Sequence, residues 1–237
     1  MLIRELFEAS THTHVSFCFG RLNPPTIGHK TLLKTIAEIG GDYEIFVSQT
    51  QDKKKNPLDY ATKIEFMQKM FPEYASHIVV DPNLNTILKV ASSLYNKGYR
   101  QVTLVAGSDR LDTMQKLLQD YNGVEGKAHG YYKFELIDAK SSGNREDGAE
   151  GVSGISASNA RLAAANGDFD AFKESTGAGD NAISLYKAVR EGLGIHDTTE
   201  DAAGVGIVTK QNTTKDVNKG TLRKMMKAYH LTDSSYS

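Results

Sequence analysis

The sequence predicts an α/β fold in which a parallel sheet carries helices on both faces, followed by a C-terminal helix and an extended tail. Short apolar segments rich in β-branched and aromatic residues alternate with segments whose apolar residues recur every three or four positions. Of the 237 residues, 39% are hydrophobic, which is enough for one sizeable core. Such alternation favours a parallel sheet with right-handed crossovers.

The predicted strands are short and apolar, as expected of strands covered on both faces. They lie at residues 15–19, 43–48, 77–80, 101–106 and 132–137. The intervening helices show helical spacing, as Leu32, Leu33 and Ile36 do in the first. These helices lie at residues 28–39, 60–71, 85–97 and 111–121. Helical patterns return at residues 158–165, 169–175 and 181–191, so we expect a single domain over residues 1–194.

Two stretches depart from this alternation. Residues 140–154 are rich in serine, glycine, asparagine and acids without periodicity, which predicts an exposed, mobile loop. Residues 195–237 form the predicted tail, in which residues 221–231 have the spacing of a basic amphipathic helix. Such helices often dock on another protein, so we expect a protein partner or a homo-oligomer through the tail. A tail that folds back on its own domain, or stays disordered, is the alternative.

Composition restricts the classes of partner. The net charge of −1 gives no bias toward nucleic acid or an anionic membrane. The single cysteine, Cys18, excludes an intrachain disulfide framework, and its apolar surroundings predict a small buried side chain. No stretch approaches the ~20 apolar residues of a membrane span, and no secretory pattern is visible. We expect a cytoplasmic protein, in the host cytoplasm if it is viral, that binds neither membrane nor nucleic acid.

The strongest functional signal joins the first strand to the first helix, in the segment Phe19-Gly20-Arg21-Leu22-Asn23-Pro24-Pro25-Thr26-Ile27-Gly28-His29. Gly20 lets the chain turn without a Cβ penalty, and Gly28 lets a ligand approach the backbone. The helix start offers free N–H groups and the positive end of a dipole, which together bind anions. His29 and Arg21 add an imidazole and a guanidinium there. An ordinary turn with an incidental histidine is the alternative.

A second helix start follows in Ile155-Ser156-Ala157-Ser158-Asn159-Ala160-Arg161. Ser158 is a good N-cap, Ser156 can donate to phosphate, and Arg161 stands one turn further on the same side. Plain helix capping with a solvated arginine is the alternative.

Two further loops follow predicted strands. In Val105-Ala106-Gly107-Ser108-Asp109-Arg110, Gly107 permits close approach to a nucleotide, and Asp109 either binds a hydroxyl, amine or metal-bound water or caps the next helix. The other loop, Ser48-Gln49-Thr50-Gln51 and then Lys53-Lys54-Lys55-Asn56-Pro57-Leu58, places Lys55 where it can meet an anion. A solvated loop is the alternative for these lysines.

Over residues 15–175 these segments resemble the HxGH nucleotidylyltransferase superfamily, which includes nicotinamide-mononucleotide, pantetheine-phosphate and glycerol-phosphate transferases. Thr26-Ile27-Gly28-His29 matches the HxGH motif with threonine first, and residues 155–161 match ISxTxxR with Ser158 replacing threonine. The resemblance implies a Rossmann-like fold. It also implies that His29 contacts the α-phosphate and stabilises the transition state, that Thr26 touches phosphate, and that Arg21 assists.

The resemblance extends to the other loops. It implies that Gly107 and Asp109 take part in nucleotide or acceptor binding. Residues 48–58 are similar to the S-x-Q…KNP segment of archaeal-type nicotinamide-mononucleotide adenylyltransferases. Ala61-Thr62-Lys63-Ile64 stands where those proteins have a Glu-Arg pair, which leaves the acceptor open.

The expected reaction is attack by an acceptor phosphate oxygen on the α-phosphorus of a nucleoside triphosphate, with release of pyrophosphate. The acceptor is already anionic, so no protein nucleophile or base is needed. Arg21, His29, Lys55 and Arg161 would offset the growing charge, together with Mg²⁺ held mainly by the phosphates and by no protein metal site.

We expect ATP as donor and a small acceptor such as nicotinamide mononucleotide. A CTP-dependent cytidylyltransferase acting on a small phosphate ester is the alternative enzyme. A class I aminoacyl-tRNA synthetase uses a similar loop, but this chain is short for its tRNA-binding parts. An alternative of another class is a structural or binding subunit, for example of a viral particle, with residual catalysis.

Overall fold

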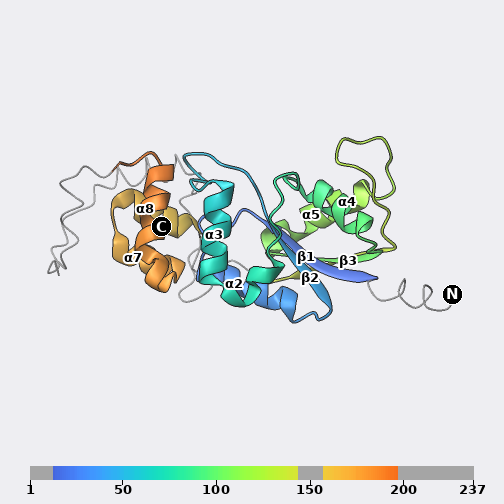
Figure 1. Ribbon diagram of the computed structural model, residues 1–237, viewed down its shortest axis with the longest axis horizontal. Helices are drawn as coiled ribbons and strands as arrows, with labels where there is room; N and C mark the ends of the chain where they lie inside the picture. The colour runs from blue at the N-terminus through green and yellow to red at the C-terminus, as the bar shows by residue number, and fades with distance from the viewer. Residues whose placement is uncertain (1–12, 144–156, 197–237) are drawn as a thin grey trace, which may run out of the picture.

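The computed structural model describes residues 13–143 and 157–196, and within them four parallel strands form one sheet (Figure 1). The strand order is β2-β1-β3-β4. The strands are β1 (His14–Gly20), β2 (Asp42–Val47), β3 (Gln101–Ala106) and β4 (Leu136–Ser141). Because β1 pairs with β2 on one side and with β3 on the other, the direction of winding reverses beside β1. The carboxyl ends of β1 and β3 are therefore the expected place for a ligand.

Helices cover both faces of this sheet, which confirms the predicted α/β architecture. The helices are α2 (Ile27–Ala37), α3 (Tyr60–Met70), α4 (Ile87–Asn96), α5 (Ser108–Asp120), α6 (Ala157–Asn166), α7 (Phe169–Thr176) and α8 (Ala182–Gly192). Alternate residues of β1 face opposite cores, as the period of a strand requires. Val15 and Phe17 pack with α4 and α5, whereas Cys18 packs with α2 and α3.

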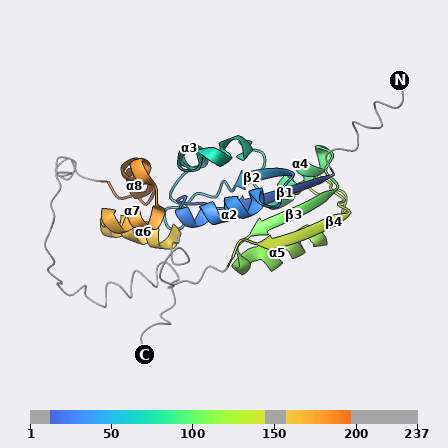
Figure 2. The same ribbon diagram turned by 90° about the horizontal axis from the view of Figure 1, so that it is seen from below.

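A third apolar cluster lies at one end of the sheet, where α6, α7 and α8 gather (Figure 2). Phe172, Leu185 and Val189 form its centre, and Leu58 and Phe66 join it from the loop before α3 and from α3 itself. The helices after β4 are thereby tied to the loop that follows β2.

The predicted strand at residues 77–80 is wrong. A 3₁₀ helix, η1 (Pro72–His77), occupies its start, and only Ile78 forms a bridge with Ile45 of β2. Proline at the first helical position favours this turn. The Val79 N–H donates to the Ile45 carbonyl over 2.9 Å, and Nδ1 of His77 lies 3.1 Å from the Tyr43 carbonyl oxygen. The outer edge of β2 is therefore partly covered, which limits pairing with other chains.

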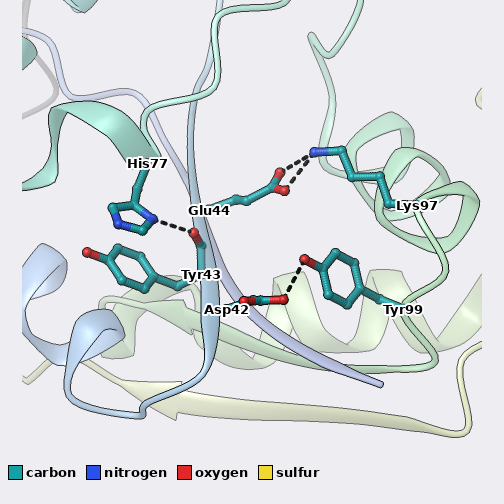
Figure 3. Close-up of polar contacts among 6 residues, drawn as sticks. All are labelled: Asp42, Tyr43, Glu44, His77, Lys97 and Tyr99. Atoms are coloured by element: carbon teal, nitrogen blue, oxygen red, sulfur yellow. Dashed lines mark hydrogen bonds and ion pairs between the residues drawn. The ribbon is translucent and has the colours of Figure 1, made fainter. Parts of the chain in front are cut away.

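Side chains from the α4–β3 connection hold the beginning of the same strand (Figure 3). Lys97 contacts both carboxylate oxygens of Glu44, at 2.6 and 2.7 Å, and the Tyr99 hydroxyl donates to Asp42 over 3.0 Å. On the other side of β2 the Tyr43 and His77 rings stack with centroids 3.8 Å apart. This polar network lies at the amino end of β2.

The last strand begins later than predicted. Tyr132 and Phe134 were expected in a strand but bond elsewhere: the Tyr132 hydroxyl donates to the Leu118 carbonyl over 2.8 Å, and the Phe134 N–H donates to Asn122 over 2.8 Å. β4 instead runs to Ser141, so residues 140 and 141 are not the start of a loop. Their polarity is that of an edge strand with one exposed face. Residues 144–154 of the predicted loop lie outside the described residues.

Candidate active site

A cavity of about 270 Å³ opens at the carboxyl ends of β1 and β3, where the strand order reverses. Its walls come from the loops after β1, β2 and β3 and from the start of α6. The structure brings most of the predicted site residues together in this cavity, namely Gly20, Arg21, His29, Lys55, Gly107, Asp109, Ser158 and Arg161. Thr26 and Gly28 are not among the lining residues, and Ser156 lies outside the described residues.

His29 reaches the cavity with its ring held from behind by Thr26. The Thr26 backbone N–H donates to Nδ1 of His29 over 3.0 Å, and the Thr26 hydroxyl lies 3.1 Å from the same nitrogen. This contact belongs to a capping box at the start of α2, with histidine in the place usually taken by glutamate. Because Nδ1 accepts, the network assigns the ring hydrogen to Nε2, which makes Nε2 a donor. In this geometry the buried Thr26 orients His29.

The turn that precedes the helix is made differently from the sequence interpretation. Leu22, not Gly20, has the left-handed backbone conformation, with φ of 47°. A Cβ placed on Gly20 would meet Leu22 at 3.4 Å, which is ordinary contact. The Leu22 side chain is buried in the core beside α2. This packing holds the backbone of Leu22 in a conformation that leucine rarely adopts. The next peptide bond, Asn23–Pro24, is cis.

Asn23 joins three parts of the site, and sequence analysis missed it. Its side chain donates to the Leu58 carbonyl over 2.9 Å and accepts from the Leu58 N–H over 3.1 Å. Its own carbonyl accepts from Arg161 over 2.6 Å. A buried side-chain amide can bond to both the N–H and the carbonyl of one residue, as the backbone of a neighbouring strand would. No local pattern signals this role, because Leu58 and Arg161 are distant in the sequence.

Arg161 is anchored to two of these segments. Besides its bond to Asn23, the guanidinium donates through Nη2 to the Ser158 hydroxyl over 3.0 Å. Because α6 begins at Ala157, Ser158 lies inside the first turn and is not the N-cap that we predicted. Its hydroxyl fixes the arginine instead. These contacts hold a planar cation at the cavity wall, the geometry that favours phosphate recognition.

The loop after β3 contributes Gly107 and Asp109. Gly107 is the N-cap of α5, and Asp109 stands in the first turn, so the capping alternative for Asp109 is wrong. About half of the Asp109 side chain is exposed, and its carboxylate lies 3.7 Å from Nε of Arg110. Arg110 also lines the cavity and was not predicted as a site residue. A carboxylate beside a guanidinium can accept a hydroxyl or amine hydrogen while anions bind nearby.

Positive charge dominates this cavity. Among the described residues that line it, Asp109 is the one acid, against Arg21, Lys55, Arg110 and Arg161. No group of three or more histidine, cysteine or acidic side chains suited to a metal occurs in residues 13–143 and 157–196. The four cationic side chains are a donor set suited to phosphate.

Comparison with known families agrees with this geometry. The cytidylyltransferase-like family matches residues 17–140, which is just over half of the chain. The chain therefore belongs to the cytidylyltransferase-like family, and the resemblance to HxGH nucleotidylyltransferases is confirmed. No curated protein matches the chain significantly. None of the helices in the described part of the chain combines the length and apolar character needed to cross a bilayer.

Proposed function

We propose that this chain transfers a nucleoside monophosphate from ATP to a small phosphate acceptor such as nicotinamide mononucleotide, with release of pyrophosphate. The observation that carries the proposal is the cavity itself, which places the His29 imidazole among Arg21, Lys55 and Arg161 at the switch point of the sheet. Membership of a cytidylyltransferase-like family supports the reaction class.

In the proposed step an acceptor phosphate oxygen bonds to the α-phosphorus while the bond to the bridging oxygen of the β-phosphate breaks, and pyrophosphate leaves with that electron pair. Nε2 of His29 donates to a non-bridging α-phosphate oxygen as its charge grows. Arg161 and Lys55 hold the departing phosphates, and Arg21 steadies the two anions against their repulsion. Mg²⁺ supplies further charge neutralisation when it arrives with the triphosphate. Asp109 is the cavity carboxylate that would face it.

The CTP-dependent alternative has its own support, because the matching family is described as cytidylyltransferase-like. The residues that contact phosphate would serve either base, so they do not distinguish ATP from CTP.

The deciding experiment measures pyrophosphate release with each of the four nucleoside triphosphates and Mg²⁺, in the presence of nicotinamide mononucleotide or of glycerol phosphate. Turnover with ATP and the mononucleotide supports the proposal. Turnover only with CTP and glycerol phosphate supports the cytidylyltransferase. Triphosphate binding without turnover under any combination contradicts both and favours a binding or structural subunit.

A further inference from the structure

The turn at residues 52–56, between β2 and α3, closes around a single carboxylate. Oδ1 of Asp52 accepts from the backbone N–H groups of Lys54, at 2.9 Å, and Lys55, at 2.6 Å. Oδ2 accepts from the Asn56 side-chain amide at 2.5 Å, and the Asp52 N–H donates to the Asn56 carbonyl over 2.9 Å. Burial alone would raise the pKa of Asp52, but these hydrogen bonds lower it to about 2.

This turn belongs to the loop at residues 48–59, between β2 and α3, and both ends of the loop are bonded to other parts of the protein. At its start the fully buried Lys63 ammonium donates to the carbonyls of Ser48 and Thr50. At its end Leu58 is held by the Asn23 amide. The loop is thus tied to α3 and to the loop after β1, which carries the HxGH-type motif.

Helix α8 supports the loop from behind. A Cβ built on Gly192 would lie 2.1 Å from the Pro57 carbonyl oxygen, so the helix and the loop are in direct backbone contact there. Because hydrogen bonds hold both ends of the loop and α8 packs against Pro57, the loop has little freedom to move as a whole. The direction of the lysine side chains then depends on the conformation of the turn at residues 52–56.

The three consecutive lysines of this turn have different surroundings. Lys53 and Lys54 are exposed, whereas Lys55 is half-buried and is the one that lines the cavity. The backbone N–H groups of Lys54 and Lys55 both donate to one carboxylate oxygen of Asp52. These two hydrogen bonds fix the backbone conformation at Lys55, and with it the direction of the Lys55 side chain.

We propose that Asp52 is a positioning residue, whose carboxylate holds the turn so that Lys55 enters the cavity and binds polyphosphate. Asp52 acts through Lys55 and touches no reacting atom. The inference rests on the proposed function only for the identity of the anion.

The test measures binding of inorganic pyrophosphate with Mg²⁺ to the full chain by titration calorimetry, because this probe does not depend on the base or on the acceptor. We expect Asp52→Ala and Lys55→Ala each to weaken binding by roughly tenfold, the size typical of one charge-assisted contact. The double variant should bind no more weakly than either single variant, because both changes remove the same interaction.

Two controls separate positioning from general damage. Asp52→Asn should bind within about twofold of the wild type, because its carbonyl keeps both backbone N–H bonds. Asn56, whose Oδ1 has no hydrogen-bond partner among the described residues, can turn its amide to accept. Lys53→Ala, in the same turn, should leave binding unchanged. Melting curves report folding, and Asp52→Ser replaces Asp52→Ala if the latter unfolds.

Wild-type affinity in Asp52→Ala, or losses that multiply in the double variant, would overturn the inference while leaving the proposed reaction intact. Pyrophosphate binding that follows the expected pattern in a protein without turnover would instead overturn the proposed reaction and leave the inference standing. A wild type that fails to bind pyrophosphate overturns both.

Discussion

At the scale of single residues, the site depends on side chains whose orientation is set before any ligand arrives. The His29 ring is held through Nδ1 by Thr26 and presents its other nitrogen as a donor. If both ring nitrogens carried hydrogens, Nδ1–H would face the Thr26 N–H, and two donors would oppose each other. The contact therefore favours the tautomer with its hydrogen on Nε2, which can donate to a developing oxyanion.

We predict that His29→Ala lowers pyrophosphate release by roughly 10²–10³-fold, the usual cost of removing one preorganised donor. The fold should survive, because His29 lies at the cavity wall and not at the centre of an apolar cluster. Pyrophosphate release and circular dichroism measure the two effects. His77→Ala, which alters a histidine outside the cavity, is the control. Turnover like that of the wild type in His29→Ala would contradict the mechanism.

Cys18 provides a test of the core. It is fully buried beside α2 and α3, and burial raises the pKa of its thiol to about 12. Because the thiolate is the reactive form, native protein at neutral pH should resist iodoacetamide. Mass spectrometry should find one modified cysteine only after denaturation. Rapid modification of the native protein would show that this part of the core is open.

At the scale of elements, periodicity in the sequence was sufficient to predict most of the fold. The helices α2, α3 and α4 lie within three residues of their predicted bounds, because each carries a clear apolar stripe. Strand predictions failed where pairing, and not composition, decides the outcome. Residues 77–80 are as apolar as a strand, but a proline-initiated 3₁₀ turn leaves room for a single bridge.

In the candidate site too, features with a local sequence pattern were predicted, whereas features that depend on long-range contacts were not. Motifs placed His29 and Arg161 near each other because each belongs to a recognisable helix start. Asn23, Arg110 and the Asp52 turn were missed, because their roles depend on partners that only the folded chain brings close or on local contacts without a motif. Ser158 lines the cavity, but the N-cap role predicted for it is wrong, since the helix begins one residue before it.

The anchoring of Arg161 between α6 and the loop after β1 leads to a prediction about phosphate discrimination. Arg161→Ala should weaken binding of a nucleoside triphosphate more than that of the corresponding monophosphate, because we propose that the anchored guanidinium binds the β- and γ-phosphates. Calorimetry with ATP and AMP compares the two losses. Arg161→Lys should recover only part of the difference, since lysine lacks the planar fork. Equal losses for both nucleotides would remove Arg161 from the triphosphate site.

The Asp52 turn predicts a pH dependence of stability. Its hydrogen bonds lower the pKa of Asp52 from 3.8 to about 2, although burial acts in the opposite direction. The folded protein thus binds this proton more weakly than the unfolded chain, so the contribution is complete above about pH 4 and disappears as the pH falls toward about 2. Melting temperatures of the wild type and Asp52→Asn should differ above about pH 4 and converge below it. Parallel curves would contradict the assignment.

At the scale of the whole molecule, the helices after β4 belong to the same body as the sheet. Leu58 and Phe66 are buried among α6, α7 and α8, and Gly192 contacts Pro57. The chain then closes α8, with Gly194 and Ile195 donating to the carbonyls of Glu191 and Arg190. A nucleotidyltransferase domain over residues 1–194 and a tail from residue 195 remain our prediction, and these contacts place Ile195 and its neighbours with α8.

The last prediction concerns residues 197–237, which lie outside the described residues and include the basic segment that we expect to dock on a partner. Residues of the described part of the chain line the cavity and build three apolar clusters, so we expect that removing residues 197–237 leaves turnover and melting temperature close to the wild type. The cut falls after His196 because an earlier cut at residue 195 would remove the Ile195 bond that closes α8.

Two controls bracket this truncation. A chain that ends at residue 181 also lacks α8, whose Leu185 and Val189 are fully buried, and it should lose both stability and turnover. If the tail mediates self-association, size-exclusion chromatography with light scattering should show fewer subunits per oligomer for the chain that ends at residue 196 than for the full chain, although both are active. Loss of activity through unfolding on removal of residues 197–237 alone would instead place the tail within the domain, and an unchanged particle size would remove it from self-association.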